Sequence, residues 1–84
     1  MYKRVFSKQF IKAILKLRGK EAENTAKKIV QIVNAEDINR FKNLRNSLKK
    51  YKRVHVSISF VILFYQVGDC VYFDNYLHHD EAYV

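Results

Sequence analysis

The sequence predicts an α+β fold in which an N-terminal strand and two helices pack on a twisted antiparallel sheet. Apolar residues recur at helical spacing from Phe10 to Val33, and the period changes to two from Tyr51 onward. The chain contains no proline and only two glycines, which leaves little of it for loops. Its 84 residues give room for one domain, residues 1–84, with one modest core.

The first elements are a short strand and two helices. Residues 2–6 form the strand candidate, and Ser7 is a suitable N-cap for the helix that follows. We expect this helix to end at Arg18 and Gly19, because glycine is the usual residue beyond a helix C-terminus. The second helix covers residues 20–33, and its apolar face consists of Ala22, Ala26, Ile29, Val30 and Val33.

The segment of residues 34–50 has a less regular pattern. Its apolar residues are Ile38, Phe41, Leu44 and Leu48. They predict either a short third helix over roughly residues 36–43 or an irregular crossing segment that these side chains anchor.

The last third of the chain reads as strands. Val54, Val56 and Ile58 face one side, so Arg53, His55 and Ser57 face the other. Residues 60–67 and 70–77 predict a hairpin around Gly68 and Asp69, because Gly-Asp suits a tight turn. This register pairs Tyr65 with Tyr72 and Phe64 with Phe73, and we expect these aromatic pairs to be mainly core.

Charge divides the chain into two unequal parts. The formal net charge is +8, and residues 1–53 carry all 16 basic side chains and four acidic ones. Such a balance favours an anionic partner, either nucleic acid or an acidic protein. Membrane is not expected as a partner, because the longest apolar stretch is too short and too polar to span a bilayer. The lone cysteine, Cys70, lacks an internal partner, so a reducing cytoplasm fits best.

All three histidines lie in this last third of the chain. Arg53 and His55 share one face of a strand and can meet the same phosphodiester, although a solvated outer face explains them equally well. One of His78 and His79, helped by Asp80, is a candidate acid or base, because the pKa of histidine lies near neutrality. We expect no metal site there, since neighbouring strand residues point to opposite sides. A polar chain end is the plainer alternative.

Further residues are candidates for RNA contacts. Tyr83 has the chemistry to stack on a base or to anchor the C-terminal segment on the sheet. The basic residues before and within the first strand of the last third are candidates for phosphate binding, although lysine pairs are more often solvated. They are Lys42, Arg45, Lys49, Lys50 and Lys52. The sequence has no Gly-rich phosphate loop, so nucleotide hydrolysis has no support.

These strand residues resemble a known family. The segments that carry the resemblance are residues 51–56 (YKRVHV), 60–65 (FVILFY), 71–73 (VYF) and 79–83 (HDEAY). They are similar to the RelE/ParE toxin superfamily, and most similar to its YafQ-like branch, which has an Arg-x-His-Val strand and a closing His-x-x-x-aromatic. The resemblance is specific over residues 44–83 and implies one RelE-like toxin domain over residues 1–84.

The resemblance also implies a function. It implies the toxin of a type II toxin–antitoxin system, a ribosome-dependent endoribonuclease that cuts mRNA and is silenced by a cognate antitoxin. His55 matches the strand histidine of the family, His79 the C-terminal histidine, Tyr83 the closing aromatic, and Arg53 a basic residue beside the scissile phosphate. The expected partners are the antitoxin, the ribosome and mRNA, and no cofactor is expected.

The sequence departs from the branch at two positions. An acid normally follows the strand histidine, where this chain has Ser57 and Ser59, and an upstream histidine of the branch falls near Lys42. Asp80 is the candidate to replace the missing acid. The alternative is a non-catalytic binding protein of the same fold, either a gyrase-inhibitor-like relative or an inactive toxin.

Overall fold

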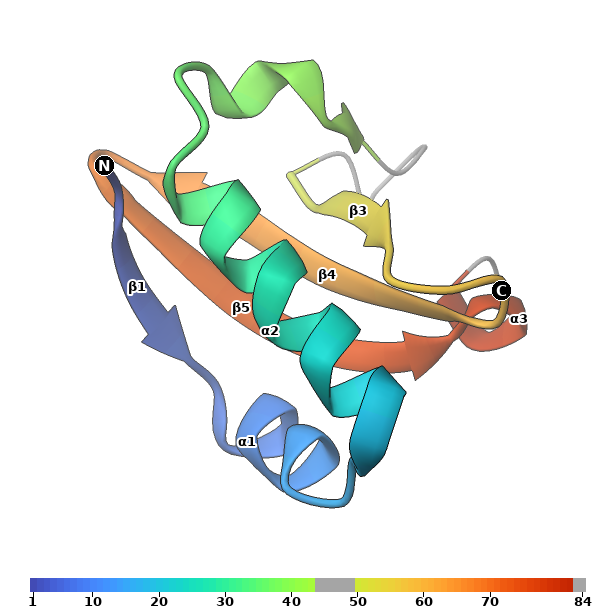
Figure 1. Cartoon of the computed structure of the whole chain (residues 1–84). Helices are drawn as coiled ribbons and strands as arrows, with labels where there is room; N and C mark the ends of the chain where they lie inside the picture. Colours follow the sequence, from blue (N-terminus) through green and yellow to red (C-terminus); the bar gives the residue numbers. More distant parts are fainter. Residues whose placement is uncertain (44–49, 83–84) are drawn as a thin grey trace.

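The computed structural model describes residues 1–43 and 50–82. Within them, five strands form one sheet in the order β1-β5-β4-β3-β2, and α2 lies across one face of it (Figure 1). The predicted site residues Arg45, Lys49 and Tyr83 lie outside the described residues. The elements in chain order are β1 (Lys3–Phe6), α1 (Lys8–Ile14), α2 (Gly19–Val33), the 3-10 helix η1 (Ile38–Arg40), β2 (Lys42–Asn43), β3 (Lys52–His55), β4 (Phe60–Val67), β5 (Cys70–His78) and α3 (His79–Ala82).

The main core lies between the helices and this face of the sheet. Phe10 of α1 and Ile32 of α2 are fully buried against Phe64 of β4 and Phe73 of β5. The rings of Phe10 and Phe73 are 5.5 Å apart, so the core centre is aromatic. Val61 and Leu63 point to the opposite face, where they form a small second cluster with parts of Tyr51 and Leu77. We call this opposite side of the sheet the far face.

The N-terminal predictions are mostly confirmed. Ser7 caps α1, because its Oγ accepts a hydrogen bond from the Phe10 amide at 3.0 Å. The predicted end of α1 is wrong, since the helix ends at Ile14. Leu15 is 72% exposed, so the apolar stripe is wider than the buried face. Gly19 has φ +55° and starts α2, so its left-handed backbone serves the turn between the helices.

The predicted helix over residues 36–43 is wrong. The chain forms only the short η1 turn, where the Asp37 carboxylate accepts the Asn39 amide at 2.9 Å, and then the two-residue strand β2. Ile38 is fully buried and Phe41 packs against Phe64. The alternative of an irregular segment anchored by apolar side chains therefore holds for these residues.

The predicted hairpin is confirmed, with Tyr65 opposite Tyr72 and Phe64 opposite Phe73. Strands β2 to β5 are antiparallel, whereas β1 joins the edge of β5 in parallel. The first strand of the last third ends at His55, and Ile58 beyond it is 95% exposed, so its predicted place on the apolar face is wrong. Among the described residues, no helix has the length and apolar character needed to cross a membrane.

Candidate functional site

Two of the three histidines meet at one end of the sheet. His55 is the last residue of β3, and His79 is the first residue of α3, directly after β5. Their ring centroids are 5.9 Å apart, with an interplanar angle of 43°. The backbone fixes this meeting, because the His79 amide donates to the Ser59 carbonyl at 2.7 Å, in the loop that follows β3.

Strand alternation places His55 on the far face. Val54 packs against the main core, so its neighbours Arg53 and His55 point away from the helices. In the register, His55 lies opposite Val61, and Val61 opposite Leu77. The predicted grouping of Arg53 and His55 on one face is therefore confirmed.

The electrostatics of His55 favour its neutral form. Partial burial lowers the pKa of His55 below its ordinary value of 6.5, and the positive charges of Arg53 and His79 lower it further. The His55 side chain is exposed. At neutral pH it is thus an accessible imidazole that is ready to accept a proton.

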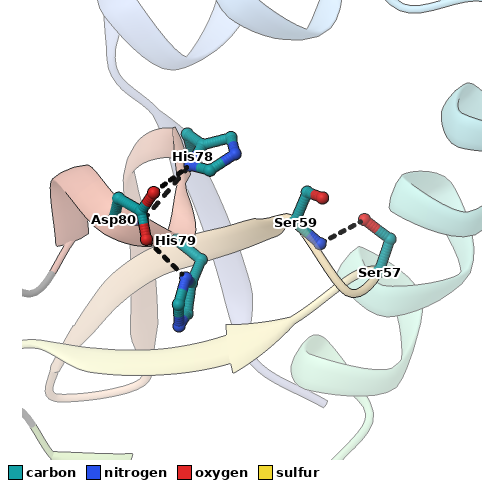
Figure 2. A network of polar contacts seen from close by, with 5 residues as sticks. All are labelled: Ser57, Ser59, His78, His79 and Asp80. Atoms are coloured by element: carbon teal, nitrogen blue, oxygen red, sulfur yellow. Dashed lines mark hydrogen bonds and ion pairs between the residues drawn. The ribbon is translucent and has the colours of Figure 1, made fainter.

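Asp80 holds the neighbouring histidines (Figure 2). Its Oδ1 lies 3.1 Å from His79 Nδ1, and its Oδ2 lies 3.6 Å from His78 Nδ1. The Asp80 amide also points to His78 Nδ1, at 3.3 Å. An Nδ1–H bond to the carboxylate would orient the His79 ring and leave Nε2 for a substrate. The structure pairs His79, not His78, with His55, a choice that the residue pattern left open and that the resemblance had made for His79.

The loop of residues 56–59, which follows β3, carries Ser57 and Ser59. The Ser59 amide approaches Ser57 Oγ at 3.4 Å, and the two serines lie beside the histidine segment (Figure 2). Among the described residues, no group of three His, Cys, Asp or Glu side chains is arranged to hold a metal ion. Asp80, whose Oδ1 lies 3.1 Å from His79 Nδ1, is a carboxylate placed to orient His79.

The predicted phosphate-binding lysines differ in their exposure. Lys52 is only 6% exposed, and its Nζ donates to Asn43 Oδ1 at 2.9 Å and to the Phe41 carbonyl at 3.5 Å. It points away from Arg53 because adjacent strand residues alternate, so a direct RNA contact by Lys52 does not fit this structure. Lys50 is exposed, and Lys42 pairs with Arg53 in the β2–β3 register.

The structure also shows an aromatic group that sequence reasoning assigned to the core. Tyr65 and Tyr72 are half-buried on the far face, outside the main core, and Tyr51 joins them. The spacing of Tyr51, Arg53 and His55 at every second residue is the sequence signal that places Tyr51 on the same face as the histidine.

Comparisons with known proteins identify the fold. Neither family models nor curated proteins match the sequence. Solved structures do: YafQ from E. coli has 16% identity and TM-score 0.76 over 100% of both chains. The isolated RelE toxin from E. coli has 18% identity and TM-score 0.76, covering 98% of this chain and 95% of that one. RelE in the RelB–RelE antitoxin–toxin complex from Methanococcus jannaschii has 22% identity and TM-score 0.72 over 94% of each chain. The chain therefore has the RelE-like toxin fold that its sequence resembles.

Proposed function

We propose that this protein is the toxin of a type II toxin–antitoxin pair and a ribosome-dependent endoribonuclease that cleaves mRNA. The observation that carries this proposal is the pair of His55 and His79 rings at 5.9 Å, with Arg53 on the same face. The shared fold of YafQ and RelE supports it. The proposed partners are an antitoxin, the ribosome and mRNA, and the proposed place is the cytoplasm.

The residues suggest a metal-independent reaction. Neutral His55 takes the proton of the ribose 2′-hydroxyl, whose oxygen attacks the adjacent phosphorus. His79, oriented by Asp80, gives a proton to the leaving 5′-oxygen, so the P–O5′ bond breaks and a 2′,3′-cyclic phosphate forms. Arg53 stabilises the negative charge of the phosphorane. Each proton transfer is worth about 10²–10⁴ in rate.

Mapping mRNA ends on translating ribosomes tests this function. The wild-type protein should create new 5′-hydroxyl ends within the open reading frame, and the double variant His55→Ala/His79→Ala should create none. If the wild-type protein binds ribosomes without cutting mRNA, the endonuclease proposal is wrong.

A non-catalytic binding protein of the same fold is the second candidate. The serines at 57 and 59, where the resembling branch carries an acid, favour it. In that case both proteins in the mapping experiment would leave mRNA intact.

A further inference from the structure

Three tyrosines and one lysine form a continuous group on the far face. The Tyr65 and Tyr72 rings stack across β4 and β5, with centroids 5.1 Å apart and an interplanar angle of 5°. Tyr51 meets Tyr65 edge-on at 5.5 Å. Lys50 Nζ lies 4.8 Å from the Tyr65 ring centroid and 5.1 Å from that of Tyr51. We call these four residues the tyrosine platform.

Packing in the main core does not account for the tyrosine platform. The helices pack on the other face of the sheet, and all three rings remain half-buried. A cross-strand aromatic pair does stabilise a hairpin, which explains Tyr65 with Tyr72. Tyr51 also packs against the small cluster of Val61 and Leu63, which explains part of its position. Neither contact explains why a lysine ammonium rests on the rings.

One extended segment connects the tyrosine platform with the histidine pair. Tyr51, Arg53 and His55 are alternate residues, so their side chains share the far face. Four residue steps of extended chain lead from Tyr51 to His55, about 13 Å at the rise of a strand. Arg53 lies between these two residues, so a positive charge stands between the tyrosine platform and the histidine pair.

We propose that the tyrosine platform binds an unpaired base of the RNA substrate by stacking, at a nucleotide away from the scissile bond. This inference rests on the proposed ribonuclease function and names a substrate-positioning subsite for it. Aromatic faces accept any base, and a basic track beside them follows the backbone, which is the usual recognition of single-stranded RNA. Lys50 would then leave the rings for a phosphate. The stacked rings of Tyr65 and Tyr72 beside the Lys50 cation favour RNA over an acidic peptide, because a base stacks on an aromatic face and a carboxylate does not.

A binding assay with an uncleavable ligand tests the platform apart from catalysis. The probe is a short single-stranded 2′-O-methyl RNA, which lacks the attacking hydroxyl, compared with an abasic strand of equal length. Tyr65→Leu should weaken binding of the base-containing strand by about five- to 100-fold and leave the abasic strand unaffected. Tyr65→Phe keeps the ring and should retain most of the affinity.

Lys50→Ala is the matched control for charge. It should weaken binding of both strands and reduce the salt slope of log Kd by about one, because a phosphate contact does not depend on bases. Circular dichroism confirms that each variant folds.

The outcomes are separable from those of the proposed function. Base-dependent binding that Tyr65→Leu abolishes supports the platform even if mRNA is never cut. Equal losses on both strands, unchanged affinity in Tyr65→Leu, or no binding of the probe by the wild-type protein would each overturn the platform, while leaving the mRNA-end mapping to decide catalysis.

Discussion

His55 carries the most informative chemistry at the scale of one residue. Its neighbours oppose its protonation, whereas His79 has a carboxylate within hydrogen-bond distance. Two histidines in different surroundings are suited to different roles, one as base and one as acid. These surroundings support the proposed order of proton transfers, with His55 as the base and His79 as the acid.

The lowered pKa of His55 predicts the pH dependence of cleavage. A general base works only when it is unprotonated, so the acid limb of kcat/KM should lie below pH 6.5. Arg53→Ala removes a charge that opposes protonation, so the pKa of His55 should rise and the limb should move to higher pH. Arg53→Lys should move it less. The measurement is the pH–rate profile, with exposed Arg18→Ala as control; an unmoved limb in Arg53→Ala would contradict the role of His55 as base.

Replacing Lys52 is predicted to lower the free energy of unfolding more than replacing Lys50. Lys52→Ala leaves the Phe41 carbonyl and Asn43 without their buried partner, so the free energy of unfolding should fall by about 1–3 kcal/mol. Lys50→Ala removes an exposed cation–π contact and should cost less than about 1 kcal/mol. Urea denaturation of both variants measures this. Equal losses would show that the burial of Lys52 does not contribute to stability.

At the scale of elements, a polar contact ties α2 to β5. The buried Tyr76 hydroxyl donates to Glu21 Oε1 at 2.9 Å. Burial and the Glu21 carboxylate raise the pKa of Tyr76 to about 12, so the phenol stays protonated at physiological pH.

Removing this hydroxyl should loosen α2 on the sheet. Tyr76→Phe should lower the free energy of unfolding by about 1–2 kcal/mol, because a charged acceptor loses its donor. In a Glu21→Ala background the same change should cost much less. Thermal denaturation of the four proteins of this double-mutant cycle measures the coupling. If Tyr76→Phe lowers the free energy of unfolding equally in both backgrounds, the hydrogen bond to Glu21 does not account for the loss.

Local signals predicted the elements that depend on local chemistry. Gly68 and Asp69 between alternating apolar runs predicted the hairpin and its register, and Ser7 predicted the start of α1. The parallel pairing of β1 with β5 joins the two ends of the chain and has no local signal. The end of α1 was missed because Leu15 continues the apolar stripe without being buried.

The same reasoning applies to the site. Alternation placed Arg53 and His55 together because both belong to one strand. The partnership with His79 depends on β5 ending at His78 and α3 beginning at the next residue, which a strand pattern cannot show. Lys52 was misjudged because a lysine inside a basic run reads as exposed, although its position in the strand directs it to the core side.

For the whole molecule, the uneven charge predicts how a partner binds. With 16 basic and four acidic side chains, residues 1–53 should bind an acidic antitoxin segment, and log Kd should rise with log salt. Titration at several salt concentrations measures the slope. Binding that is indifferent to salt would count against an electrostatic interface.

The most direct test of the account is single-turnover cleavage of ribosome-bound mRNA by His55→Ala, His79→Ala and the double variant. Each single variant should be slower by about 10²–10⁴, and the double variant should lose little more than the slower single variant, because the pair acts as one unit. All three should retain the wild-type free energy of unfolding to within about 0.5 kcal/mol, since both side chains are partly or largely exposed. Wild-type rates in either single variant would remove that histidine from the chemistry and contradict the account.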